Sequence, residues 1–475
     1  MVFSSIVFLF YFFPLLLIVY FLIGKRYKNV TLLLFSIVFY SWGAPRFIFV
    51  ILGTTLLDFF LVKWMSSITI EWKRRIALTI SICVNLGLLF YFKYSNFFIE
   101  NVNLALEDIG IQGVLWTKLI LPIGISFYTF ETLTYVIDVY RRVHKPLTNF
   151  WDYQLYIILF PKLIAGPIIR YHEIADQIKD RKDNENVDMR ITGLFRFVLG
   201  LSKKVLIANV LGAQADAVFA MNYNEISVFT AWIGILTYTF QIYFDFSGYS
   251  DMALGIGKML GFKFPENFNN PYVSGSITEF WRRWHISLGN WMRNYLYIPL
   301  GGNKVKSKSR LYFNLWFVFL ASGLWHGASW SFVLWGAYHG IFLILERVGL
   351  NKFYLFIGRI PSMILTFFFV IIGWVFFRIE KLDDAFLYIQ KMFVFGVHPT
   401  SITIEKEVFV IFILAFLFAF FTVFKIGQKI QDKVYADKHS FSLYVCFAPF
   451  VIILFMLSVA SITASGFNPF IYFRF

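Results

Sequence analysis

Long apolar stretches separated by short polar segments recur along the whole chain. A run of about 20 apolar residues is long enough to cross the hydrocarbon core of a bilayer as a helix. Lipid offers no hydrogen-bond partners, so such runs must satisfy their backbone groups internally, which favours helices. The pattern predicts an all-α, polytopic integral membrane protein that forms one domain over residues 1–475. Expected spans include residues 1–23, 29–43, 46–65, 76–96, 117–139, 361–377, 408–424 and 441–463.

The distribution of basic residues predicts the orientation of the first five spans. Basic segments at 25–28, 63–75 and 141–145 alternate with segments that carry no Lys or Arg. Cytoplasmic loops are enriched in Lys and Arg, so this alternation places the N-terminus outside. The same rule explains the net charge of +15 without a nucleic-acid partner. Residues 151–169 contain prolines and are flanked by bases on both sides, which predicts a re-entrant hairpin enclosed by protein.

Polar, titratable chemistry is concentrated between residues 280 and 330, where two histidines stand among several tryptophans. Helical spacing places Trp284, Leu288, Trp291 and Tyr295 on one apolar stripe. This stripe predicts an amphipathic helix at the membrane surface, anchored by tryptophan. His285 falls at the seam between its two faces, where a functional role and a bystander role are both open.

His326 follows an apolar run and is framed by Trp325 and Trp330. An ionisable side chain at membrane depth is costly and usually serves a function, although a structural histidine is the alternative. Burial favours the neutral imidazole, which can act as a general base. His339 is expected to be structural. The seven histidines and two cysteines show no metal-ligand spacing, so no metal site is expected.

Several long motifs, in one order, resemble those of the membrane-bound O-acyltransferase family. The resemblance is strongest to the bacterial branch that O-acetylates alginate, peptidoglycan and related exported polymers. It rests on FWRRWHISLGNWMRNYLYIPLGGNK at Phe280–Lys304 and on the SGLWHGASW tract within Ser322–Gly340. Further matching tracts are Pro122–Arg142, Phe160–Arg170, Gln241–Phe262 and the terminal FIYFRF at Phe470–Phe475.

The resemblance implies a multi-pass protein of the bacterial inner membrane, with helices around a central acyl-transfer tunnel and with re-entrant and interfacial helices. It implies acetyl-CoA as the acyl donor and an acceptor on the outer side. The family's catalytic histidine corresponds to His326, and its second essential histidine corresponds to His285. Tyr472 resembles the residue that accepts the acetyl group before a periplasmic or extracellular acetyltransferase or esterase-like partner takes it.

Four basic residues near His285 are candidates for holding the phosphates of the donor, because phosphate is bound by cationic hydrogen-bond donors. They are Arg282, Arg283, Arg293 and Lys304. Bases at an inner membrane interface also bind lipid headgroups, so membrane lipids are the alternative ligand.

Two other functions fit parts of the pattern. One is transfer of D-alanine to teichoic acid, which is a related acyl transfer. The other is a transporter with an intramembrane histidine, for which Asp58 and Asp245 would be supporting carboxylates. A transporter often has inverted halves with broken helices, and the sequence shows no such symmetry.

Overall fold

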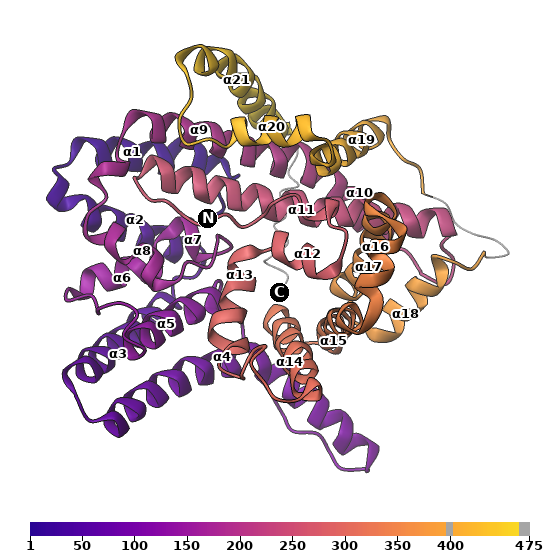
Figure 1. Ribbon diagram of the computed structural model, residues 1–475, viewed down its shortest axis with the longest axis horizontal. Coiled ribbons are helices and arrows are strands. Elements are labelled where there is room, and N and C mark those ends of the chain that lie inside the picture. The colour runs from indigo at the N-terminus through magenta and orange to yellow at the C-terminus, as the bar shows by residue number, and fades with distance from the viewer. Residues whose placement is uncertain (396–401, 465–475) are drawn as a thin grey trace. The chain divides into compact units, whose positions relative to one another are not determined.

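The computed structural model describes residues 1–395 and 402–464, and the regular elements within these residues are helices (Figure 1). The chain divides into two compact units. Unit 1 comprises residues 1–186 together with 256–264, and unit 2 comprises residues 187–255 together with 265–475. The prediction of an all-α protein is confirmed.

Unit 1 begins with an apolar helix in which a π-helical turn, Phe8–Phe12, continues directly into α1. Helix α4 is a single helix of 38 residues that packs against both α3 and α5. The helices of unit 1 are α1 (Phe13–Leu22), α2 (Lys28–Gly43), α3 (Ile48–Ser67), α4 (Glu71–Asp108), α5 (Ile125–Tyr140), α6 (Phe150–Ile158), α7 (Phe160–Leu163) and α8 (Tyr171–Lys179).

The predicted span at 117–139 is too long at its beginning, because helix α5 starts only at Ile125. Pro122 and Gly124 explain the late start. Gly124 has a φ of 77°, a left-handed conformation that favours glycine. A Cβ atom at this position would lie 2.8 Å from the carbonyl oxygen of Leu163.

The expected re-entrant segment is a broken helix. Helix α6 ends at Ile158, Leu159 leaves the helical conformation, and α7 has only four residues. Pro161 lies in this short helix, where its missing N–H is tolerated in the first turn. Residues 153–160 are all buried in protein, as irregular backbone at membrane depth requires.

Unit 2 has an aromatic core in which Tyr272, Phe280, Trp284, Trp335 and Trp374 are all buried. Its helices are α9 (Val187–Ser202), α10 (Asn209–Phe219), α11 (Val228–Met259, whose last four residues fall in unit 1), α12 (Ile277–Arg283), α13 (Ile286–Trp291), α14 (Lys308–His326), α15 (Trp330–Leu345), α16 (Asn351–Ile357), α17 (Arg359–Arg378), α18 (Leu382–Lys391), α19 (Lys406–Phe420), α20 (Lys425–Val434) and α21 (Phe441–Ala464).

Glycines allow α14 and α15 to pack in close contact as a hairpin (Figure 1). A Cβ atom on Gly323 would collide with the carbonyl oxygen of Phe332, and one on Gly336 would collide with that of Phe319. Small residues let helix backbones approach closely. This packing fixes the end of α14, where His326 lies.

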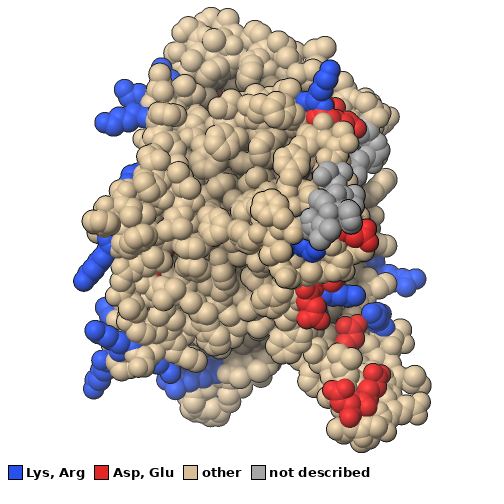
Figure 2. Space-filling view, turned by 90° about the vertical axis from the view of Figure 1, so that its right-hand side faces the viewer, with Lys and Arg blue, Asp and Glu red and all other residues tan. Residues whose placement is uncertain are grey.

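In the part of the chain that the structure describes, five helices are long and apolar enough to cross a membrane: α3, α4, α17, the segment Lys406–Val423 that contains α19, and α21. They coincide with five of the expected spans. Most of the surface drawn in Figure 2 consists of uncharged side chains. The chain is a multi-pass membrane protein.

Candidate functional site

The two candidate histidines belong to unit 2, and His285 lies at a break between two short helices. Helix α12 ends at Arg283, Trp284 is extended, and His285 has a φ of 46°. Few residues other than glycine adopt this left-handed conformation, although Asn, Asp and His do so more often than others. Helix α13 then starts at Ile286.

The prediction of one amphipathic helix at the membrane surface is therefore wrong. The helix is interrupted, and all four residues of its apolar stripe are buried: Trp284, Leu288, Trp291 and Tyr295. Backbone contacts from residues 267–269 stabilise the break. The amide of Ile286 donates to the carbonyl of Asn267 over 2.9 Å, and the amide of Asn269 donates to the carbonyl of Arg283 over 2.9 Å.

The side chain of Asn267 also indicates which ring nitrogen of His285 carries the proton. Its Oδ1 lies 3.0 Å from Nδ1 of His285 and accepts from the hydroxyl of Ser287 over 2.9 Å. Its Nδ2 donates to the hydroxyl of Ser250 over 3.1 Å, so the amide oxygen faces the histidine. A carbonyl oxygen only accepts hydrogen bonds, so Nδ1 of His285 carries the proton and Nε2 keeps its lone pair.

The imidazole of His285 is neutral and its Nε2 is unused. The residue is 1% exposed, and burial lowers its pKa to about 3. Among the residues that the structure describes, Nε2 has no hydrogen-bond partner. A buried polar atom without a protein partner costs free energy unless a water molecule or a ligand group bonds to it.

His326 ends α14 and is enclosed by aromatic rings. It is 4% exposed, and its ring centroid lies 4.8 Å from that of Trp325, 5.2 Å from that of Trp335 and 5.1 Å from that of Phe377. The next residue is Gly327, where a Cβ atom would collide with the ring of Phe332.

Trp325 lies beside both candidate histidines. Its indole is 4.8 Å from the ring of His326 and 6.0 Å from the ring of His285. The fold thus brings together two imidazoles that are far apart in the sequence. His339 is also buried, but its ring packs between Trp281 and Trp335 at 5.0 and 5.1 Å. Within residues 1–395 and 402–464, no three His, Cys, Asp or Glu side chains group as metal ligands would.

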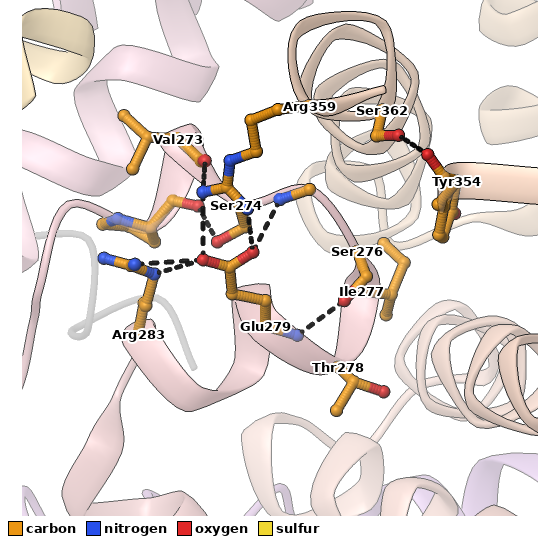
Figure 3. Close-up of polar contacts among 12 residues, drawn as sticks. Val273, Ser274, Ser276, Ile277, Thr278, Glu279, Arg283, Tyr354, Arg359 and Ser362 are labelled. Carbon is orange, nitrogen blue, oxygen red and sulfur yellow. Dashed lines mark hydrogen bonds and ion pairs between the residues drawn. The ribbon is translucent and has the colours of Figure 1, made fainter. Parts of the chain in front are cut away.

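The four candidate phosphate ligands differ in their surroundings. Arg282, Arg293 and Lys304 are exposed. Arg283 is already engaged: its Nε donates to Glu279 over 3.0 Å, and its Nη1 donates to the carbonyl of Asn269 over 3.1 Å. Figure 3 shows Arg283 and Arg359 on the same carboxylate of Glu279. Tyr472 lies outside the described residues.

Sequence reasoning did not identify Asn267. The available signal was the asparagine-rich segment 265–270, PENFNN, because asparagine often stabilises irregular backbone through its side chain. That signal indicates a turn and does not identify which asparagine contacts a histidine 18 residues later.

Residues 77–382 match the model of the membrane-bound O-acyltransferase family, and this segment contains both histidines and Asn267. The chain belongs to this family. The prediction of the family and of an acyltransferase enzyme is therefore confirmed. A membrane-bound O-acyltransferase requires an acyl donor, so the enzyme account replaces the transporter alternative. Asp58 and Asp245, which had suggested a transporter, have local partners: Asn85 donates to Asp58 over 2.8 Å, and Lys204 pairs with Asp245 at 2.8 Å.

This acyltransferase is similar to curated bacterial proteins over most of its length. It is 45% identical over 403 residues to a probable alginate O-acetylase of Pseudomonas aeruginosa, covering 84% of this chain and 76% of that protein. It is 37% identical over 426 residues to a peptidoglycan O-acetyltransferase of Helicobacter pylori, covering 82% and 80%. A teichoic acid D-alanyltransferase of Bacillus subtilis is more distant, at 29% over 280 residues, which cover 55% of this chain and 69% of that protein.

Proposed function

We propose that this acyltransferase is an O-acetyltransferase of the bacterial cytoplasmic membrane. It moves acetyl from cytoplasmic acetyl-CoA to an acceptor on the outer side, for O-acetylation of an exported polymer of the peptidoglycan or alginate type. The observation that carries the proposal is the pair of buried imidazoles beside Trp325, in a chain similar to two kinds of polymer O-acetyltransferase. The D-alanyltransferase is similar over a smaller share of the chain, which favours acetyl as the acyl group.

In the proposed reaction, His326 takes the proton of the acceptor hydroxyl as the oxygen attacks the thioester carbonyl. The tetrahedral intermediate then expels the CoA thiolate, which receives that proton from the imidazolium of His326. One carbon–oxygen bond forms and one carbon–sulfur bond breaks, so no oxidant or metal is consumed. A phenol has a pKa near 10 and is a weak nucleophile at neutral pH, so a general base contributes about 10²–10⁴-fold.

His285 has a different role in the proposal. Its Nε2 lone pair accepts a hydrogen bond from the acceptor hydroxyl and orients the oxygen toward the thioester. The contact with Asn267 supports this role, because it keeps the proton on Nδ1. Orientation of two reactants is itself a large source of rate enhancement.

The remaining parts of the proposal concern access and delivery. Arg282, Arg283, Arg293 and Lys304 contact the donor phosphates at the inner mouth of a tunnel through the helices. Tyr472 is the acceptor that carries the acetyl group to the outer side. A periplasmic or extracellular acetyltransferase or esterase-like partner then takes it for the polymer.

Replacement of His326 by Ala tests the catalytic proposal. We expect the variant to insert into the membrane in normal amount and to lose acetylation of the exported polymer by at least about 10²-fold, because the general base is gone. Base-labile acetate on the purified polymer measures the activity, and His144→Gln, a change in a loop, is the control. Wild-type acetylation in the His326→Ala strain would refute the proposal.

The carrier step has its own test. With acetyl-CoA present, we expect intact-protein mass spectrometry to detect an acetylated form of the wild-type enzyme, and Tyr472→Phe should abolish it because the phenol oxygen is gone. An acetylated form that persists in this variant would show that another group carries the acetyl.

A further inference from the structure

Unit 1 contains a cavity of about 350 Å³ where the chain leaves the apolar helix Phe8–Leu22. The proposed acyl-transfer chemistry uses none of its residues. Six of the lining residues are basic and three are acidic. The lining includes Lys25, Arg26, Lys28, Asn29, Val30, Trp151, Asp152, Lys179, Asp180, Arg181, Lys182 and Glu185.

Each of the three carboxylates already has a partner within the cavity wall. Asp152 accepts a hydrogen bond from Asn29 over 3.0 Å. Asp180 pairs with Lys182 at 3.4 Å. Glu185 accepts from the hydroxyl of Tyr20 over 2.7 Å and also pairs with Lys28. Asp180 and Glu185 are therefore paired with cations, whereas Asp152 is hydrogen-bonded by a neutral amide.

Three cations of the wall are not engaged in this way. Lys25, Arg26 and Lys179 are exposed, and none has a hydrogen bond or ion pair with a residue that the structure describes. A fourth cation, Arg181, is 7% exposed. It is held by the side-chain oxygen of Asn29 at 2.7 Å and by the carbonyl of Leu260 at 3.1 Å. The cavity thus has one cation, Arg181, that is held in place, and three exposed cations without a hydrogen bond or ion pair to a described residue, of which Lys25 also lies within electrostatic range of Asp180.

Apolar side chains lie directly beside these cations. Leu22 ends α1 and is 83% exposed, and Trp151 and Val30 in the cavity wall are 58% and 48% exposed. Tryptophan and basic side chains at the end of an apolar helix are typical of the level of the lipid headgroups. A free inorganic anion would gain nothing from this apolar surface, whereas an amphiphile would contact both parts.

We propose that this cavity binds the headgroup of an anionic phospholipid from the membrane leaflet in which α1 ends. The lipid phosphate lies against Lys25, Arg26 and Lys179, and the acyl chains lie along the exposed apolar side of α1. Basic clusters next to membrane helices bind anionic lipids through the same attraction.

Lipid selectivity of the full-length wild-type enzyme is the first test. Purified protein in neutral detergent is titrated with phosphatidylglycerol, phosphatidylcholine or inorganic phosphate, and retained lipid is counted by native mass spectrometry with thermal stability as a second measure. We expect phosphatidylglycerol to bind at least about tenfold more tightly than phosphatidylcholine. Equal binding of the two lipids would overturn the proposal, as would competition by inorganic phosphate at the same concentration as the lipid.

The second test assigns the site. The triple variant Lys25→Gln, Arg26→Gln, Lys179→Gln should bind phosphatidylglycerol at least about tenfold more weakly than wild type. Lys306→Gln, Lys308→Gln, Lys352→Gln removes the same charge from exposed positions of unit 2 and should bind like wild type. Equal affinity of the two triple variants would overturn the assignment. Wild-type selectivity is measured separately, so a triple variant that does not fold leaves the first test intact.

Discussion

Unit 2 contains two buried polar clusters, which differ in whether their polar atoms have hydrogen-bonding partners. In the ion-pair cluster, Arg196 donates to Asp251 over 3.0 Å and to Glu266 over 2.6 Å, and Lys203 donates to Asp251 over 2.6 Å and to Tyr435 over 2.9 Å. At the histidine site, His285 is neutral, and its Nε2 has no partner among the described residues.

This difference suggests that the ion-pair cluster contributes mainly to stability and that the histidine site contributes mainly to the proposed reaction. Charges buried with opposite partners hold elements together, and each charge depends strongly on the others. A neutral nitrogen that is buried without a partner stabilises nothing by itself, and in the proposed function it accepts a hydrogen bond from the acceptor hydroxyl. Changes in the cluster should therefore affect folding first, and changes at the histidine site should affect turnover first.

The largest expected effect is on the ion-pair cluster. Asp251→Asn removes the charge shared by Arg196 and Lys203 and leaves two cations under-compensated, which costs about 3–5 kcal/mol. We expect a much lower yield of monodisperse protein and a lower melting temperature in detergent. Asp383→Asn, an exposed change in α18, is the matched control. Normal stability of Asp251→Asn would break the comparison.

Asn267→Leu should have the next largest effect, and we expect this effect on catalytic activity. Without the amide oxygen, the proton of His285 is no longer held on Nδ1, and we expect kcat to fall by about 10²-fold with little change in KM for the donor. Ser287→Ala removes only a second donor to the same oxygen and should cost far less. A loss confined to KM would indicate that Asn267 shapes the binding site and does not orient the imidazole.

The pH dependence of stability tests the buried neutral imidazole directly. His285 has a folded pKa of about 3, whereas an unfolded histidine has a pKa of about 6.5. Between these values the unfolded state binds the extra proton, so the stability contribution is present above pH 6.5 and is lost as pH falls. Between pH 7 and pH 5, we expect the wild type to lose about 2 kcal/mol more of its free energy of unfolding than His285→Asn loses. The measurement is the drop in melting temperature of each protein over this pH range. An identical drop in both proteins would contradict this.

The smallest effect is expected at the ion pair of Arg359 with Glu279 (Figure 3). The side chain of Arg359 is 56% exposed, and exposed ion pairs contribute about 0–1 kcal/mol. Arg359→Gln should therefore leave both the melting temperature and turnover close to wild type. A large loss in either would place this pair with the buried cluster.

The sequence predicted the five long apolar helices because an apolar run is a local signal, whereas the roles of His285 and His326 stay predictions. About 20 apolar residues suffice for a span, and an imidazole at membrane depth stands out. The break at His285 was missed because helical spacing alone does not distinguish a stripe at the membrane surface from residues buried in a core. Trp284 and Leu288 fit both, and the decision comes from Asn267, which is distant in sequence.

The left-handed backbone at position 285 restricts which amino acids can replace the histidine during evolution. Glycine, asparagine and aspartate adopt this conformation at low cost, whereas most other side chains would strain the backbone. The residue at 285 therefore contributes both a backbone conformation and an imidazole. An alanine scan would merge the two contributions, whereas asparagine at 285 keeps the shape and removes only the imidazole.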